Sequence, residues 1–192
     1  MDKEKRYYRS ELRAAAGEDK RGVEGYAALF NVESADLGFR EKILPGAFDG
    51  VIEESDVMCP LDHNMSRGIL ARSNKGKGSL TLTIDEKGLK YNFTAPNTAL
   101  GDEVIEGISR GDIAGSSFCF VVEKETWEDL ENGEYLRSIE KIKRLYDVSP
   151  VYNPAYPDTT VALRSLEEAR KKCGHETPID MGAYYREVEQ QY

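Results

Sequence analysis

The sequence predicts a mainly β protein with flanking helices (α+β), in which about seven strands form a closed or partly closed β-barrel. Three observations support this fold class. Apolar and polar residues alternate along much of the chain, as they do in strands with one buried face. Helical spacing of apolar residues is confined to a few short segments. The 192 residues, 40% of them hydrophobic, are enough for one core and contain no internal repeat.

Strand-forming segments dominate after the first 20 residues. Residues 23–30 are apolar and aromatic, residues 39–44 alternate in polarity, and residues 57–63 carry an apolar run with polar residues on both sides. Residues 79–95 predict a hairpin, because alternating apolar residues flank a turn at residues 85–88.

A second hairpin is predicted further along the chain. Its arms are residues 116–127 and 135–151, and its turn is Glu131-Asn132-Gly133. The returning arm is long, so a bend within it is expected. Residues 159–163 are expected to form a last short strand.

Three helices are expected. Pro45, which suits a first-turn position, opens a short helix that ends near residue 54. Asn97-Thr98 can cap a second helix, which has apolar residues on one face and ends at Gly111. A third begins at Ser165, with acidic residues in its first turn and basic residues in its last, as the helix dipole favours.

These elements suggest three parts of the chain. Residues 1–20, charged and rich in alanine, read as a flexible or edge-pairing lead-in. Residues 21–164 are expected to form the β-barrel domain. Residues 165–192 are expected to form a C-terminal helix and tail.

Composition argues against several classes of protein. The chain has no run of 18 apolar residues, and its charged start leads into no apolar signal region, so we expect a soluble intracellular protein without membrane contact. Its three cysteines include no CxxC pair, which gives no support to a disulfide framework or a thiolate zinc site. We therefore expect neither a metal nor a cofactor.

The charge distribution argues against nucleic acid as a partner. The formal net charge is −9, of which residues 1–96 carry −1 (15 basic against 16 acidic) and residues 97–192 carry −8 (11 against 19). No segment offers the basic stripe that contacts with phosphates require.

The chain contains only two histidines, His63 and His175, and His175 lies in the predicted tail. Any chemistry in the barrel that uses an imidazole at neutral pH must therefore use His63. If residues 57–63 form a regular strand, Cys59, Leu61 and His63 share one face and Asp62 points to the other. The alternative is a structural histidine held by a backbone carbonyl.

The segment around Ser117 offers a nucleophile. Strand alternation places Ser117 and Cys119 on one face, opposite an apolar face that includes Phe118 and Phe120. The alternative is a strand whose small residues serve packing. Cys119 is a competing nucleophile, but its position between two phenylalanines favours an inert, packed thiol.

Asp147 stands within an apolar strand, where an isolated carboxylate is unfavourable unless it is paired or hydrogen-bonded. Its partner could be Arg144, Lys143 or an imidazole. The order His63, Ser117, Asp147 matches none of three familiar triad orders, and no GxSxG elbow is present. The residues by themselves thus support a β-rich domain with a candidate triad.

Five short blocks resemble, in order, the prohead maturation proteases of tailed bacteriophages, which are related in fold to the herpesvirus maturation protease (assemblin). The resemblance extends over roughly residues 8–170. The blocks are Glu24 to Asn31 (EGYAALFN), Arg40 to Phe48 (REKILPGAF), Leu61 to Arg67 (LDHNMSR), Gly107 to Phe120 (GISRGDIAGSSFCF), and Asp147 to Arg164 (beginning DVSPV).

The resemblance implies a role for each candidate residue. Ser117 takes the position of the nucleophile, His63 that of the general base, and Asp147 that of the third triad member. Gly115 and Ser116 become candidates for the oxyanion hole or substrate binding. The loop of residues 153–158 is the other candidate for the oxyanion hole, and Arg67 or Arg164 could orient such a loop.

The resemblance also implies a function: a serine endopeptidase that cleaves the scaffolding protein, the scaffold-like segment of the major capsid protein precursor, or both, and that also cleaves itself. Such an enzyme works inside the assembling procapsid in the host cytoplasm. The herpesvirus relatives suggest a homodimer, although the oligomeric state stays open. The alternative is a non-catalytic module that binds capsid or scaffolding protein on the same fold.

Overall fold

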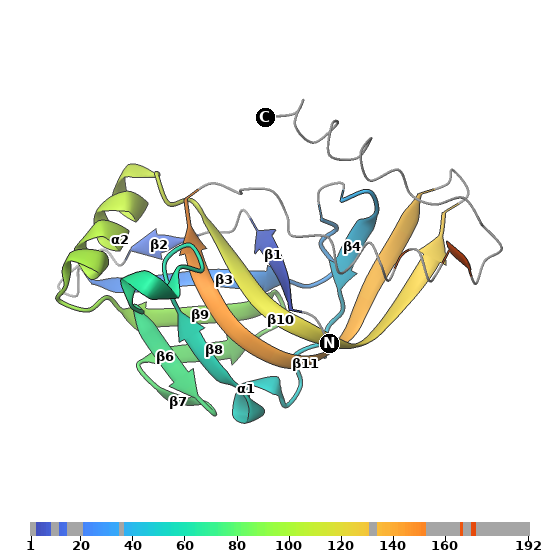
Figure 1. Cartoon of the computed structure of the whole chain (residues 1–192), viewed down its shortest axis with the longest axis horizontal. Coiled ribbons are helices and arrows are strands. Elements are labelled where there is room, and N and C mark those ends of the chain that lie inside the picture. Colours follow the sequence, from blue (N-terminus) through green and yellow to red (C-terminus); the bar gives the residue numbers. More distant parts are fainter. Residues whose placement is uncertain are drawn as a thin grey trace.

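The computed structural model describes residues 3–8, 12–14, 21–34, 37–130, 134–152, 166, 170 and 171. Its elements are, in chain order, β1 (Glu4–Tyr8), β2 (Arg13–Ala14), β3 (Gly22–Leu29), β4 (Arg40–Ile43), α1 (Val51–Glu54), β5 (Asp56–Cys59), the 3₁₀ helix η1 (Met65–Arg67), β6 (Ala71–Asn74), β7 (Lys77–Gly78), β8 (Leu80–Ile84), β9 (Gly88–Thr94), α2 (Ala99–Arg110), β10 (Gly115–Asp129) and β11 (Tyr135–Val151). The protein is therefore mainly β with few helices, as predicted (Figure 1).

The strands form two sheets. The larger sheet has the order β1-β10-β11-β5-β6-β7, and β4 pairs in parallel with the distal part of β11. The smaller sheet has the order β2-β3-β9-β8. Both predicted hairpins are present, as β8–β9 and β10–β11.

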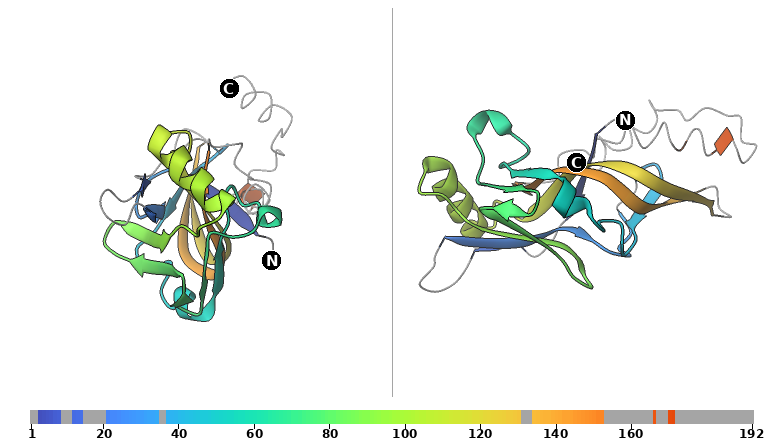
Figure 2. Two further views of the ribbon diagram at one scale, coloured as in Figure 1. Left: turned by 90° about the vertical axis from the view of Figure 1, so that its left-hand side faces the viewer. Right: turned by 90° about the horizontal axis from the view of Figure 1, so that it is seen from below.

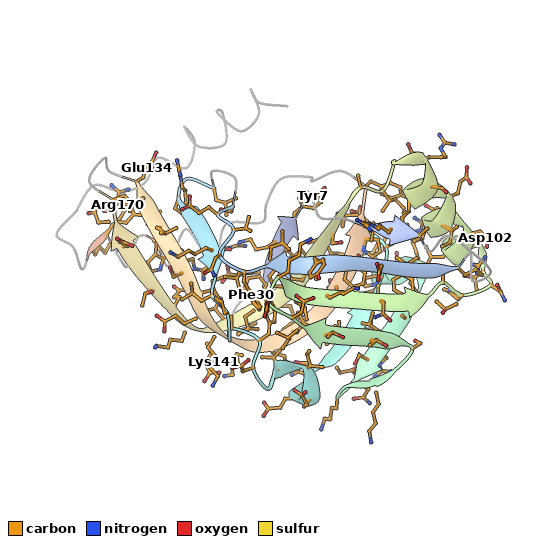
Figure 3. All side chains as sticks on the ribbon, turned by 180° about the vertical axis from the view of Figure 1, so that it is seen from behind. Tyr7, Phe30, Asp102, Glu134, Lys141 and Arg170 are labelled. Atoms are coloured by element: carbon orange, nitrogen blue, oxygen red, sulfur yellow. The ribbon has the colours of Figure 1, made fainter. Side chains whose placement is uncertain are left out.

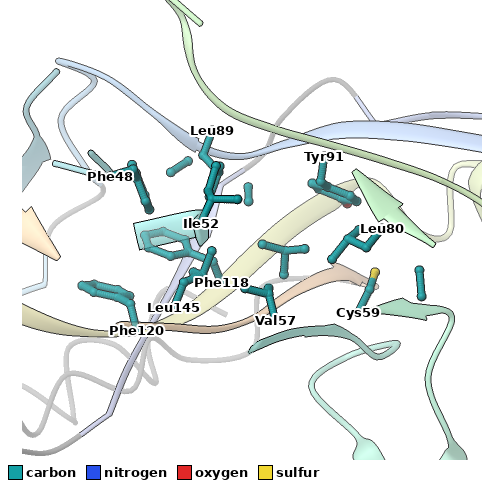
Figure 4. Packing of buried hydrophobic residues seen from close by; sticks show 14 of the residues in the cluster. Phe48, Ile52, Val57, Cys59, Leu80, Leu89, Tyr91, Phe118, Phe120 and Leu145 are labelled. Carbon is teal, nitrogen blue, oxygen red and sulfur yellow. The ribbon is translucent and has the colours of Figure 1, made fainter. Parts of the chain in front are cut away.

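The main hydrophobic core lies between the two sheets. Tyr91 and Leu89 of the small sheet belong to the same buried cluster as Phe118 and Val57 of the large one (Figure 4). The rings of Phe118 and Phe120 stack with their centroids 4.5 Å apart. These apolar side chains fix which face of β10 points inward, and so leave Ser117 on its opposite face.

The expected closed barrel is not found. Among the described residues, no strand pairing joins the two sheets. Four register shifts between residues 119 and 125 of β10 break the regular ladder, as bulges do, and bulged strands bend. The distal half of the β10–β11 hairpin extends away from the small sheet, at the end of the molecule opposite α2 (Figures 1 and 2). Short strands such as β2 and β7 also raise the strand number above the seven expected.

The described part of the N-terminal segment pairs at a sheet edge, one of the two forms expected for this lead-in. Strand β1 runs antiparallel to β10, with Tyr7 opposite Ser117. At the other end of the chain, the expected strand at residues 159–163 and nearly all of the expected tail lie outside the described residues. Leu166 is described, and it is buried against Phe39 and Tyr135 near the distal hairpin. Figure 3 places Arg170 and Glu134 at this end, far from Asp102 of α2.

Helix α2 begins and ends where its local signals predict. The Thr98 hydroxyl accepts a hydrogen bond from the Gly101 amide, and Gly111 adopts the left-handed conformation that ends the helix. The helix expected from Pro45 is shorter than predicted, because turns occupy residues 45–50 and only Val51–Glu54 is helical. In the described part of the chain, no helix is long and apolar enough to cross a bilayer.

Candidate active site

The fold brings together three side chains that lie far apart in the sequence. His63 Nε2 lies 2.6 Å from Ser117 Oγ, and His63 Nδ1 lies 2.6 Å from Asp147 Oδ1. Ser117 belongs to β10, Asp147 to the neighbouring strand β11, and His63 to the turn after β5. The predicted candidates are thus within hydrogen-bonding distance of one another.

Strand alternation determines which serine faces the imidazole. The Ser116 hydroxyl lies on the core side, 2.9 Å from the Tyr91 hydroxyl. Ser117 points the other way and is 4% exposed. Gly115, two residues before Ser117, has no room for a side chain, because a Cβ there would lie 2.1 Å from the Tyr7 hydroxyl. Gly115 therefore allows the Tyr7 side chain of β1 to pack closely against β10.

His63 does not continue the strand that the sequence predicted. Strand β5 ends at Cys59, and Asp62 and His63 both have positive φ angles, of 54° and 55°. Pro60 follows the strand and has no N–H to continue the ladder. The predicted sharing of one strand face by Cys59, Leu61 and His63 is therefore wrong.

Hydrogen bonds hold the turn in this left-handed conformation. The Asp62 N–H donates to the Pro150 carbonyl at 2.9 Å, and the Asn64 N–H donates to the Leu61 carbonyl at 3.0 Å. Non-glycine residues adopt this region at a cost of about 1–2 kcal/mol each. The turn thus lowers the stability of the fold, and in return it directs the His63 side chain toward Ser117 and Asp147.

Asp147 takes an imidazole as its partner rather than a neighbouring base. The residue is 5% exposed, and its Oδ1 also accepts a hydrogen bond from Ser149 Oγ at 3.1 Å. The Arg144 guanidinium instead lies over the Tyr146 ring, 5.2 Å from its centroid. Of the alternatives that the sequence left open, the imidazole is the one found at 2.6 Å.

The donor and acceptor roles follow from the partners. A carboxylate has only acceptor oxygens, so the bond to Asp147 requires the proton on Nδ1 and leaves Nε2 as the acceptor facing Ser117. Ser117 Oγ also lies 2.9 Å from the backbone carbonyl of Arg6 in β1, which can only accept. The single proton of the Ser117 hydroxyl therefore has two acceptors.

Of the two arginines expected to orient the loop at the oxyanion hole, the structure describes Arg67, and the expected loop of residues 153–158 lies outside the described residues. Arg67 forms a two-pronged ion pair with Glu103 of α2, and the Tyr152 hydroxyl donates to the same carboxylate. Hydrogen bonds from Arg67 and Tyr152 lower the pKa of the Glu103 carboxyl. This cluster ties the turn after His63 to α2 and to the end of β11. Arg164 and His175 lie outside the described residues.

Neither described cysteine is placed as an activated nucleophile. Burial raises the pKa of the Cys59 thiol well above its usual value, and the nearby Asp147 charge adds to this effect. Cys119 is 4% exposed, and its Cα lies opposite that of Asp147 in the β10–β11 ladder. Both ring nitrogens of His63 instead meet oxygen atoms. In the part of the chain that is described, no group of three acidic, cysteine or histidine side chains is arranged to hold a metal ion.

Two residues at the site were not predicted from the sequence. Ser149 could have been found, because it lies two positions after Asp147 and a strand presents such residues on one face. Arg6 could not, because it contributes a backbone carbonyl from a segment 111 residues before Ser117.

Comparison with known proteins identifies the class of protein to which the chain belongs. The sequence profile of the caudovirus prohead serine proteases matches residues 9–172, so the chain belongs to this family of phage maturation proteases. Among solved structures, the chain is similar to the bacteriophage T4 capsid assembly protease, gp21, with 9% identity and a TM-score of 0.44 over 80% of this chain and 100% of that one. No curated protein matches the sequence.

Proposed function

We propose that the protein is a serine endopeptidase in which Ser117, His63 and Asp147 form the catalytic triad. The observation that carries this proposal is the position of one imidazole, whose two nitrogens lie 2.6 Å from a serine hydroxyl and 2.6 Å from a buried carboxylate. Membership of the prohead serine protease family supports it independently.

The proposed reaction is acyl transfer through the Ser117 hydroxyl. His63 Nε2 takes the hydroxyl proton as Ser117 Oγ attacks the scissile carbonyl carbon, and a tetrahedral intermediate forms. His63 then gives that proton to the leaving amine as the C–N bond breaks, which leaves an acyl-enzyme. Water, deprotonated by His63, attacks the acyl carbon; the bond between that carbon and Ser117 Oγ then breaks, and His63 returns the proton to Oγ as the acid product leaves. Asp147 keeps the proton on Nδ1 and stabilises the imidazolium in both steps.

The negative oxygen of the intermediate requires hydrogen-bond donors, each worth about 3 kcal/mol. Backbone N–H groups near Gly115 and Ser116, or in the segment of residues 153–158, are the proposed donors. Arg67 acts in this proposal through its ion pair with Glu103, which orders the turn after His63. Arg164 keeps the orienting role that the family resemblance implies.

The proposed substrates are the scaffolding protein and the scaffold-like segment of the major capsid protein precursor. Cleavage would take place inside the assembling procapsid in the host cytoplasm, and self-cleavage would limit the enzyme's lifetime. Family membership supports a role in capsid maturation. A homodimer and a fold related to the herpesvirus protease complete the proposal.

Co-expression of the enzyme with the capsid precursor, followed by mass mapping of the products, tests this function. Wild-type enzyme should cleave the precursor at defined sites. Ser117→Ala and His63→Ala should fold, as judged by thermal unfolding, and should leave the precursor intact. Cleavage that persists in Ser117→Ala would exclude Ser117 as the nucleophile, and cleavage lost in a matched Cys119→Ala variant would favour the thiol.

The rival proposal, a non-catalytic assembly module, makes a different prediction. It expects His63 and Ser117 to lie beyond hydrogen-bonding reach, whereas they are 2.6 Å apart. A module of that kind would bind the precursor and leave it whole in every variant.

A further inference from the structure

Ser149 contacts both partners of the His63–Asp147 pair and has no part in the reaction proposed above. It lies on β11, two residues after Asp147, so the strand presents the two side chains on one face. Its Oγ lies 3.1 Å from Asp147 Oδ1 and 3.4 Å from His63 Nδ1. Ser149 is completely buried, with 0% exposure.

Chemistry fixes the direction of the Ser149 hydrogen bond. The Asp147 carboxylate can only accept, so the hydroxyl of Ser149 donates to it. Asp147 Oδ1 therefore receives two donors, the Ser149 hydroxyl and His63 Nδ1–H. A buried carboxylate oxygen held by a second, fixed donor cannot rotate away from the imidazole without leaving that donor unpaired, which is costly inside a protein.

We propose that Ser149 is a positioning residue, which holds Asp147 Oδ1 against His63 Nδ1 and so maintains the tautomer that accepts the Ser117 proton. This inference rests on the proposed protease function. Because Ser149 is buried, it acts through Asp147 and not through substrate. The competing explanation is that Ser149 only fills space between β10 and β11, where its Cα lies opposite that of Ser117.

Two variants separate the hydrogen bond from the packing. Ser149→Ala removes the hydroxyl, and Ser149→Cys keeps most of the volume but offers only a weak donor. A hydrogen bond to a charged group is worth about 1.5–3 kcal/mol, so kcat on a peptide containing the mapped cleavage site should fall roughly 10- to 100-fold in both. KM should stay within about twofold, because no substrate contact is lost.

Ser55→Ala is the matched control. Ser55 is a buried serine, 1% exposed, whose Oγ accepts a hydrogen bond from the Leu145 N–H of β11 at 3.2 Å. Its removal should lower the unfolding temperature about as much as Ser149→Ala does, without lowering kcat. Wild-type kcat in Ser149→Ala, or restoration of wild-type kcat by Ser149→Cys, would overturn the proposal.

A spectroscopic measurement tests the same role without turnover. The chain has only two histidines, so ¹⁵N-histidine labelling and comparison with His63→Ala identify the ring signals of His63. Wild type and Ser55→Ala should show the Nδ1-protonated tautomer, whereas Ser149→Ala should shift both ring nitrogens toward a mixture of tautomers. An unchanged tautomer in Ser149→Ala would overturn the positioning role even if the protein is a protease. Failure of wild type to cleave any precursor would instead reject the proposed function.

Discussion

The His63 ring is held at both nitrogens, so each partner has a separate effect on it. Asp147 fixes the Nδ1 proton, and an amide in its place can turn its NH₂ group toward the ring and favour the wrong tautomer. We expect Asp147→Asn to fold and to lower kcat by as much as about 10⁴-fold, leaving measurable slow turnover. Cleavage of the mapped peptide followed over hours would measure this residual rate.

Asp62→Asn is the control for that substitution. Asp62 is exposed, next to His63 in the sequence, and it contributes a backbone N–H rather than its side chain to the turn. Asparagine tolerates the left-handed conformation as well as aspartate does, so activity should stay at the wild-type level. Equal losses in Asp62→Asn and Asp147→Asn would mean that general charge, not the contact with His63, accounts for the effect.

Residue patterns drew attention to His63 and Asp147, and the family resemblance singled out Ser117. A buried acid in a strand needs a partner, and a single histidine in the domain limits the choice. The geometry of His63 could not be predicted, because its turn is held by a hydrogen bond from the Asp62 N–H to the carbonyl of Pro150, 88 residues after Asp62 and in a different strand. The conformational preferences of neighbouring residues give no information about a contact between such distant segments.

At the scale of elements, β1 is fixed by a cluster of buried charges. Arg6 binds Glu41 of β4 at 2.6 and 2.9 Å, and it binds Glu4 at 2.7 Å. Arg137 of β11 binds Glu4 and Glu41 at 2.6 and 2.7 Å. All four residues are at most 3% exposed. This cluster holds in place the strand whose Arg6 carbonyl accepts from Ser117.

The cluster makes stability depend on acidity. Burial opposes ionisation of Glu4, but Arg137 and Arg6 outweigh it and keep the pKa of Glu4 below its usual 4.5. A depressed folded-state pKa contributes stability that is fully present above the unfolded value and is lost as pH falls through the folded one. We therefore expect the free energy of unfolding to decline as pH falls below about 4.5.

Glu4→Gln tests whether this cluster of buried charges causes the loss of stability in acid. Removing the Glu4 carboxylate leaves the buried arginines Arg6 and Arg137 to share Glu41, so the cluster gains positive charge and the variant should lose about 3 kcal/mol at pH 7. Its unfolding should also be less sensitive to acid below pH 4.5 than that of wild type. Exposed Glu53→Gln should change neither property in urea titrations at several pH values. An unchanged acid dependence in Glu4→Gln would assign the loss of stability to other carboxyls.

Elements with local signals were predicted better than elements with distant partners. Helix α2 begins at a Thr98 cap and ends at Gly111, and both features are visible in a few residues of sequence. Strand β1 owes its structure to pairing with β10, more than 100 residues later, and its Glu4 and Arg6 read as an ordinary charged lead-in. Whether a charged residue is buried can be predicted only when the strands that cover it are known.

For the whole molecule, the same limit explains why the described strands do not close into the expected barrel. The strands could be predicted from the alternation of apolar and polar residues. The pairing of the sheet edges could not, because it depends on bulges in β10 that no residue pattern indicates. The distal hairpin instead builds a second small core, in which the Trp127 and Phe39 rings meet edge to face, 5.0 Å apart. The catalytic proposal depends on none of these distal contacts, because its three side chains come from β10, β11 and the turn after β5.

Labelling with a fluorophosphonate probe shows whether Ser117 is an activated nucleophile, because such probes react with serines activated by a neighbouring base. Mass mapping of the labelled wild-type protein should find one adduct, on Ser117. The adduct should be lost in Ser117→Ala and His63→Ala and should form more slowly in Asp147→Asn. A folded wild-type protein that takes no label, or takes it at a serine other than Ser117, would contradict the account.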